Sequence, residues 1–224
     1  MSPLVATEAP PLPEFTPFPK IGRLNKDMVV TEKLDGTNAA VGITEDGNVY
    51  AQSRKQIITP EKDNFNFAAW VAEHEEELIK LGPGIHFGEW WGSGIQRGYD
   101  LREKRFSLFN TGRWNSELNK YVTDPYAYIK DDGEEAVEGL DLRGETRCIE
   151  CPVCHVVPLL AVHTFDTGLI QAIYTQLKFR GSVAAPGFEN PEGVVVFHTA
   201  RGTLFKLSDA KVPPPEHDRS AAQL

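Results

Sequence analysis

Proline placement confines regular secondary structure in this chain to its middle. Six prolines fall within the first 20 of the 224 residues, at positions 3, 10, 11, 13, 17 and 19. A proline fixes φ and removes a backbone donor, so no helix can run through this stretch. Three more prolines stand together at 213–215, ahead of a polar end. We therefore expect an extended lead-in over 1–17, one folded domain over 18–212 with no separate C-terminal domain, and a disordered tail over 213–224.

The overall composition is that of a globular protein. Hydrophobic residues make up 41% of the chain and charged residues 25%, which is enough to form a core without disulfides. The net charge of -9 argues against a generally basic surface for nucleic acid, because lysine and arginine supply most phosphate contacts. No apolar run reaches the roughly 20 residues of a membrane span, and the N-terminus lacks a signal-peptide pattern. We expect a cytoplasmic monomer without membrane contact.

Short β-prone runs outnumber helical stretches. Apolar residues at helical spacing predict helices over 64–81 and 167–179, each followed by a glycine. A turn signal at 45–48 between two β-prone runs predicts a hairpin. The predicted strands are 28–31, 39–44, 49–53, 86–91, 106–110, 156–161, 194–198 and 203–207. Strands and helices in this irregular order indicate an α+β fold with mainly antiparallel sheets.

The run Lys33-Leu34-Asp35-Gly36-Thr37-Asn38 lies between two predicted strands. A lysine attacks phosphorus only as a neutral amine, whereas a free lysine side chain has a pKa of about 10.4, so cationic or apolar neighbours must assist the loss of its proton. Taken alone, the run is equally a plain polar turn, since Asp and Gly favour turns. The segments that follow it favour the chemical interpretation.

Five further segments follow Lys33 in a fixed order. They are Ser53-Arg54-Lys55, Phe87-Gly88-Glu89-Trp90, Arg105-Phe106-Ser107-Leu108-Phe109-Asn110, Glu192-Gly193-Val194-Val195-Val196 and Leu204-Phe205-Lys206-Leu207. With these segments and the lead-in at 18–23, the chain resembles the covalent nucleotidyltransferase superfamily of ATP-dependent ligases and RNA-capping enzymes. It is most similar to the RNA ligase 2-like branch, over about residues 18–208. The resemblance implies a ligase-type nucleotidyltransferase domain, unlike ATP-grasp, with the ATP pocket between two mainly antiparallel sheets.

The resemblance also implies roles for individual residues. Lys33 would be the catalytic nucleophile, and Asp35 and Gly36 would shape its loop. The residues expected around ATP are Glu32 and Lys33 through their backbone at the adenine edge, Asn38 near the phosphates, Arg54 at the ribose or triphosphate, Glu89 at the ribose, Phe109 stacked on adenine and Lys206 at the α-phosphate. The metal, Mg²⁺ or Mn²⁺, would bind Glu192, with Glu89 holding a metal-bound water.

Two positions depart from the pattern of this family. Its last motif usually has two lysines separated by one residue, whereas the residues two positions before and after Lys206 are leucine and serine. Phosphate neutralisation would then need Lys178 or Lys211. The Phe-Asp pair of the stacking motif is Phe109-Asn110 here, and an amide forms hydrogen bonds but carries no charge.

The cysteines leave two interpretations open. Cys148, Cys151, Cys154 and His155 together offer a Cys₃His zinc set. Cysteines at overlapping three-residue steps need a turn that brings all three thiols inward, so reduced thiols without metal are the alternative.

A basic segment over 96–120 is the candidate surface for nucleic acid. It carries six basic and three acidic residues, with Tyr99 and Trp114 among them. Basic residues interleaved with aromatics can follow a phosphate backbone and stack on bases. An ordinary solvated loop would show the same charge cluster.

Taken together, the resemblance implies an ATP-dependent RNA ligase involved in RNA repair. It would move AMP from Lys33 to a 5′-phosphate and seal that end to a 3′-hydroxyl. The expected partners are nucleic acid ends, RNA in preference to DNA. A minimal ATP-dependent DNA ligase and a non-catalytic nucleotide- or RNA-binding module remain as alternatives.

Overall fold

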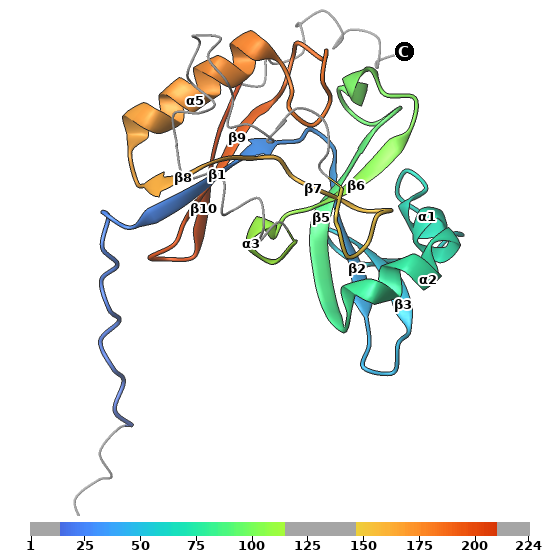
Figure 1. The fold of residues 1–224 in the computed structure, drawn as a ribbon. Helices are drawn as coiled ribbons and strands as arrows, with labels where there is room; N and C mark the ends of the chain where they lie inside the picture. Colours follow the sequence, from blue (N-terminus) through green and yellow to red (C-terminus); the bar gives the residue numbers. More distant parts are fainter. Residues whose placement is uncertain (1–13, 115–146, 210–224) are drawn as a thin grey trace, which may run out of the picture.

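Two β-sheets form the framework of the protein. The structure, a computed structural model, describes residues 14–114 and 147–209. Within these residues the strands form one sheet of four and one of six. Figure 1 shows the chain passing from β1 (Asp27–Lys33) of the first sheet into β2 (Thr37–Ile43) of the second. Residues 34–36 therefore lie at the junction of the two sheets.

The four-stranded sheet has the order β10-β9-β1-β8, and all its pairs are antiparallel. Helix α5 (Thr167–Arg180) covers one face (Figure 1) and buries Leu169, Ile173 and Leu177 in a cluster with the sheet. Asp166 caps the helix, because its carboxylate accepts hydrogen bonds from the N–H groups of residues 168 and 169. The other strands of this sheet are β8 (Leu159–Thr164), β9 (Gly193–His198) and β10 (Thr203–Ser208).

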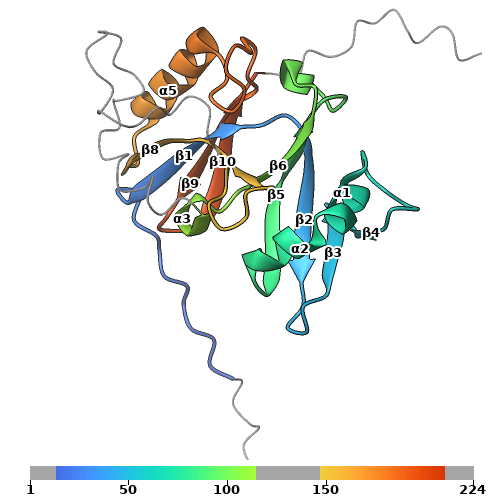
Figure 2. The ribbon, with the colours of Figure 1, turned by 45° about the vertical axis from the view of Figure 1, so that its right-hand side comes forward.

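The six-stranded sheet has the order β4-β3-β2-β5-β6-β7 and is antiparallel except for the pair β6-β7. Figure 2 shows α1 and α2 against one face of it. Phe67 of α1 packs with its ring centroid 5.3 Å from that of Trp90 and 5.1 Å from that of Phe106. The elements of this half are β3 (Val49–Ser53), β4 (Ile57–Ile58), α1 (Phe67–Glu73), α2 (Glu75–Leu78), η1 (Ile79–Leu81), β5 (Gly84–Gly92), η2 (Gly98–Asp100), β6 (Lys104–Leu108), α3 (Thr111–Trp114) and β7 (His155–Val156).

Successive side chains of β5 point to opposite faces of the sheet, so every second residue lies on the face away from the helices. Trp90 is buried in the core cluster with α1, so Phe87 and Glu89 point to the opposite face. Phe87 is 56% exposed, whereas Glu89 is only 8% exposed. The helix-free face of the sheet thus carries a sheltered carboxylate next to an open aromatic ring.

The structure confirms the predicted α+β class with two mainly antiparallel sheets, and the predicted hairpin joins β2 and β3. Three predicted elements are wrong in extent. The strand expected over 106–110 is β6, which ends at Leu108, because Asn110 already begins α3. The helix expected over 64–81 breaks at His74, whose φ of -112° is not helical, and continues as α2 and η1. The strand expected over 156–161 is interrupted at Pro158, which has no N–H to donate. Its carbonyl instead accepts a hydrogen bond from Glu32 N at 3.0 Å.

None of the helices in the described part of the chain combines the length and apolar character needed to cross a bilayer.

Candidate active site

Lys33 is the last residue of β1, and its side chain pairs with a carboxylate from the neighbouring strand region. Lys33 Nζ lies 2.6 Å from Oε2 of Glu192, 159 residues further along the chain. The β1-β9 register aligns Lys33 with Gly193, so Glu192 directly precedes the partner of the lysine. Both side chains are largely sheltered, at 22% and 14% exposure.

Glu89 of β5 holds the loop that follows Lys33. Its two carboxylate oxygens accept hydrogen bonds from Gly36 N at 3.1 Å and from Asn38 Nδ2 at 3.2 Å. A side chain at position 36 has no room, because a Cβ there would lie 2.4 Å from the carbonyl oxygen of Trp90. Burial raises the pKa of Glu89 to about 7, although the Lys33 charge and the Gly36 hydrogen bond lower it.

Three of the predicted ATP-binding residues share one cavity on the six-stranded sheet. Asn38, Arg54 and Phe109 line a cavity of about 170 Å³ together with Phe87. Phe109 is 41% exposed, so its ring is available to a ligand. Because Asn38 also bonds Glu89, this cavity adjoins the Lys33 loop.

Lys206 lies on the edge strand β10, which is separated by β9 from β1, the strand that carries Lys33. Lys206 pairs with Val195 of β9, and Val195 pairs with Thr31 of β1. Directly paired residues share a sheet face, as do residues two apart on one strand. Lys206 therefore lies on the same face as Lys33, opposite α5, and its side chain is exposed.

Lys178, one of the two candidates for a second phosphate-binding lysine, bonds within the protein. Its ammonium donates to the Pro191 carbonyl at 2.7 Å and to the Asp209 carboxylate at 2.7 Å. These bonds join the end of α5 to the segments on either side of β9 and β10. Lys211, the other candidate, lies outside the described residues.

The amide at position 110 has a local structural role. Asn110 Oδ1 accepts a hydrogen bond from Arg113 N at 3.1 Å, the arrangement by which an asparagine caps a helix. Asn110 thus begins α3 directly after the exposed ring of Phe109.

The described carboxylates near Lys33 fit a divalent cation that is shared with a phosphate. No group of three or more His, Cys, Asp or Glu residues within the described ranges is arranged to hold a metal by itself. Magnesium usually binds proteins through one or two carboxylates and takes its other ligands from water and substrate phosphates. Glu192 and Glu89, both close to Lys33, supply such a set.

The side chain of Glu32 points away from the open face, into a buried network. Its carboxylate accepts hydrogen bonds from Ser182 Oγ at 2.6 Å and from the N–H groups of Val183 and Ala184, both at 2.9 Å. Glu32 is 1% exposed. It therefore fastens the nucleophile strand to the loop after α5, which the sequence did not indicate.

Removing this carboxylate is expected to destabilise the fold. Glu32→Ala leaves one hydroxyl and two backbone N–H groups buried without their acceptor, so we expect a loss of about 3 kcal/mol in the free energy of unfolding. Urea denaturation measures it. Ser182→Ala removes one donor to Glu32 and also the acceptor of the buried Ala185 N–H, so it should cost about 2 kcal/mol. A loss in Ser182→Ala as large as that in Glu32→Ala would contradict the network.

The same carboxylate predicts a pH dependence of stability. Burial raises the pKa of Glu32 from 4.5 to about 7, despite the three hydrogen bonds that oppose the shift. The folded protein therefore binds this proton more tightly, and its stabilising effect is complete below pH 4.5 and lost as the pH rises through 7. The raised pKa of Glu89 likewise makes the folded protein less stable as the pH rises. Urea denaturation at several pH values should show that the free energy of unfolding falls less steeply with rising pH in Glu32→Gln than in wild type. If it falls equally steeply in both, Glu32 is not the source of the pH dependence.

The three cysteines are buried free thiols. Cys151 and Cys154 have their sulfur atoms 3.7 Å apart, whereas the Cys148 thiol contacts the Glu150 carboxylate at 3.4 Å. Burial raises the pKa of Cys148 to about 11, whereas the hydrogen bond with the Cys154 thiol lowers the pKa of Cys151.

We expect the purified protein to contain no stoichiometric zinc, because the described thiols do not converge on one point with a fourth ligand. Metal analysis after dialysis checks this. About one equivalent of zinc per chain, with a lower thermal stability after chelation, would contradict it.

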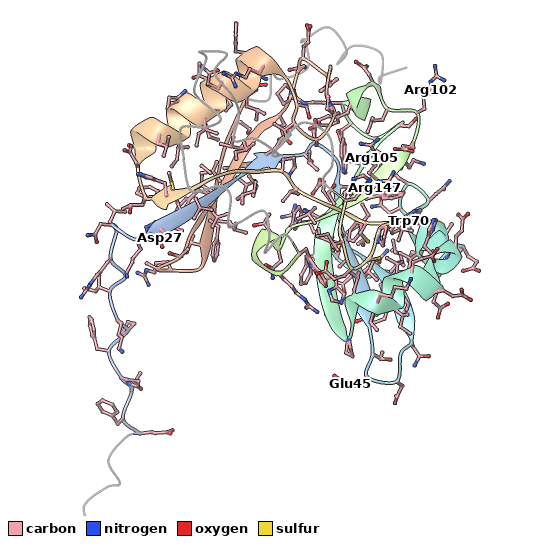
Figure 3. The ribbon with its side chains drawn as sticks, viewed as in Figure 1. Asp27, Glu45, Trp70, Arg102, Arg105 and Arg147 are labelled. Atoms are coloured by element: carbon pink, nitrogen blue, oxygen red, sulfur yellow. The ribbon has the colours of Figure 1, made fainter. Side chains whose placement is uncertain are left out.

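The basic segment over 96–120 does not form one free surface in its described part, which ends at Trp114. Arg105 pairs with Glu103 at 2.7 Å, and Arg113 donates to a backbone carbonyl at 2.9 Å. Figure 3 shows Arg102 at the outer edge of the molecule, with Arg105 further inside. The part of the candidate surface beyond Trp114 lies outside the described residues.

The sequence placed Arg97 and Tyr99 in the candidate nucleic-acid segment over 96–120 and did not indicate that they contact the nucleophile loop. Arg97 bonds the Asp35 carboxylate and the Tyr99 hydroxyl accepts a hydrogen bond from Asp35 N. The only signal in the sequence is the run of glycines at 92, 94 and 98 between two strands.

Comparisons with solved structures show the same fold. The chain is similar to three Naegleria gruberi RNA ligase variants, each with a TM-score of 0.51. An unliganded variant is 18% identical, and the match covers 82% of this chain and 50% of that variant. A variant with ATP and manganese is 18% identical, and the match covers 82% of this chain and 49% of that variant. A variant with AMP and manganese is 17% identical, and the match covers 88% of this chain and 57% of that variant.

This chain thus spans about half the length of the solved ligases that it matches. Among curated proteins, no sequence matches it. The family model described as RNA ligase matches residues 26–208, which include Lys33, Glu89, Glu192 and Lys206. Since this match takes in most of the chain and all the strands of both sheets, the chain belongs to the RNA ligase family.

Proposed function

We propose that this protein is an ATP-dependent RNA ligase that works through a lysyl-AMP intermediate at Lys33. The observation that supports it most directly is the 2.6 Å pairing of Lys33 with Glu192 beside Glu89. Asn38 links this group to the cavity lined by Phe109. A nucleophilic amine, carboxylates for a metal and an aromatic platform for a base are the groups that nucleotide transfer from ATP requires.

In the first step, the Lys33 amine attacks the α-phosphorus of ATP. A P–N bond forms, the P–O bond to the β-phosphate breaks, pyrophosphate leaves and the amine loses a proton to solvent. Only the neutral amine is nucleophilic, so the ion pair with Glu192 has to open first. Lys33 would lose its proton only once it is no longer paired with the Glu192 carboxylate.

The Glu192 carboxylate would hold a divalent cation, Mg²⁺ or Mn²⁺. When bound, it neutralises charge on the transferring phosphate. Solved Naegleria gruberi ligases with ATP or AMP contain manganese, which supports the assignment. Glu192 would ligate the cation, and Glu89 would hold a water of its coordination shell or the ribose hydroxyls.

The remaining groups would orient ATP. Phe109 stacks on adenine without requiring a particular hydrogen-bond pattern, and Arg54, which lines the same cavity, contacts the ribose or triphosphate. Asn38 and Lys206 approach the phosphates from different sheets. The Glu32 backbone N–H already bonds Pro158, so any adenine contact at this end of β1 falls mainly to Lys33.

Two further transfers complete the reaction. An RNA 5′-phosphate attacks the lysyl-AMP phosphorus, the P–N bond breaks, and the Lys33 nitrogen takes up a proton from solvent to restore the amine. A 3′-hydroxyl then attacks the adenylated 5′-phosphate and loses its proton to solvent, and AMP leaves as the new phosphodiester forms. The family of the chain supports RNA as the substrate.

Labelled ATP tests the proposal in two stages. Incubation with the α-labelled nucleotide and magnesium should give protein that keeps its label through a denaturing gel. Added 5′-phosphorylated RNA with a 3′-hydroxyl partner should then take up the label and be sealed. A matched DNA substrate should be sealed less well; better sealing of DNA favours a DNA ligase, and reversible ATP binding without covalent label favours a non-catalytic module.

A further inference from the structure

The loop between β5 and β6 lies against the nucleophile loop and against the segment that precedes Glu192. Figures 1 and 2 both show this loop near the chain that leads into β9. Its residues Arg97 and Tyr99 each contact Asp35, two positions after Lys33. The loop therefore touches both segments that carry the reactive lysine and its carboxylate partner.

Arg97 forms a bridge between these two segments. Its Nε donates to Asp35 Oδ2 at 2.9 Å, and its Nη1 donates to both the carbonyl and the side-chain oxygen of Asn190, each at 2.9 Å. A third nitrogen, Nη2, lies 3.7 Å from Asp209. A planar guanidinium presents its five N–H donors in a rigid fork, whereas a lysine ammonium is a compact point charge on a flexible stem.

Tyr99 is buried and contacts the loop that follows Lys33. Its hydroxyl accepts a hydrogen bond from Asp35 N at 2.8 Å. The ring is 1% exposed and packs at 4.8 Å from Trp91 and 4.6 Å from Phe188. Since the ring is fixed by this packing, its hydroxyl defines the position of the Asp35 backbone.

The backbone of the supporting loop is held in an unfavourable conformation. Gln96, Tyr99 and Asp100 have φ values of 47°, 54° and 54°, in the left-handed region that side chains other than glycine rarely adopt. Such conformations persist only where the surroundings impose them, and they concentrate at functional sites. One of them, Tyr99, holds Asp35 directly, and another, Gln96, precedes Arg97, whose own φ of -71° is ordinary.

We propose that Arg97 and Tyr99 are positioning residues that keep Lys33 and Glu192 in register for attack on ATP, an inference that rests on the proposed function. Arg97 fixes the distance between the loop after Lys33 and the segment before Glu192. Tyr99 fixes the path of that loop. Neither group contacts the reacting atoms; both act through Asp35 and, for Arg97, through Asn190.

Single-turnover adenylylation of Lys33 over a range of ATP concentrations tests the proposal. Arg97→Gln should lower the maximal rate by about 100-fold, since a displacement of about 1 Å at the reacting groups has this effect. The KM for ATP should change little, because the adenine cavity is untouched. Tyr99→Phe, which removes only the hydroxyl, should lower the maximal rate by about 10-fold. An unchanged maximal rate, or a loss confined to KM, would overturn the proposal.

Three further variants separate positioning from charge and from general stability. Arg97→Lys keeps the charge but cannot bridge Asp35 and Asn190, so it should recover only a small part of the rate; full recovery would overturn the bridge. In an Asp35→Asn background, Arg97→Gln should have a much smaller additional effect, and additive losses would contradict a role through Asp35. Arg23→Gln removes an equal charge from an exposed position ahead of β1 and should match wild type.

Hydrogen exchange decides the proposal without any reliance on activity. Arg97→Gln should exchange faster than wild type in peptides covering 33–38 and 189–193, with the melting temperature almost unchanged. Unchanged exchange in both peptides would overturn the positioning role even if the enzyme were less active. If wild type forms no lysyl-AMP, the proposed function fails, and faster exchange would still support the bridge.

Discussion

Lys33→Ala is expected to abolish covalent labelling by ATP while the protein remains folded. Lys33 supplies the only amine in the described structure that lies at the junction of the sheets within bonding distance of Glu192, and alanine cannot form a P–N bond. The substitution is at the end of β1, where the lysine side chain is 22% exposed, so core packing is preserved. Intact-protein mass after incubation with ATP and magnesium measures the adduct directly.

The control for this experiment is Lys80→Ala, which removes a lysine from the helical side of the other sheet. It should be labelled as wild type is. Lys33→Ala protein with a normal melting temperature and no adduct fits the mechanism. A normal adduct in Lys33→Ala would mean that another residue is the nucleophile and that the central claim is wrong.

The second large effect is expected at Glu192. Glu192→Ala removes both the partner of Lys33 and the proposed metal ligand, so adenylylation should fall by at least about 100-fold, the effect of losing a few kcal/mol of charge stabilisation. Glu192→Gln should be nearly as inactive, because an amide of the same size has no charge with which to bind the cation. Adenylylation rates across a magnesium titration measure both variants.

Glu189→Gln is the matched control, because it neutralises an exposed carboxylate three residues earlier in the same segment. It should follow the wild-type magnesium curve. If both Glu192 variants also follow that curve, Glu192 is not a metal ligand. A loss in Glu192→Ala that Glu192→Gln fully restores would indicate a steric role in place of an electrostatic one.

Local patterns were sufficient for most of the fold. Strands β1, β2, β3, β5, β9 and β10 each lie where a β-prone run predicted a strand, because alternation and β-branched residues act within a few positions. The hairpin at 45–48 followed from its turn residues for the same reason. The errors arose where one residue overrides its neighbours. His74 leaves helical geometry within an otherwise helical pattern, and Pro158 interrupts a strand by lacking a donor.

The sequence by itself determined which chemical groups are present and in which order: a lysine after a strand, a strand carboxylate, a phenylalanine and a second carboxylate. Only the tertiary structure decided which of them meet. Lys33 and Glu192 are 159 residues apart, Glu32 and Ser182 are 150 apart, and Asp35 and Arg97 are 62 apart. Contacts at such separations depend on strand order and register, which are set by the burial of whole sheet faces. No local pattern near Arg97 reveals that its guanidinium reaches both Asp35 and Asn190.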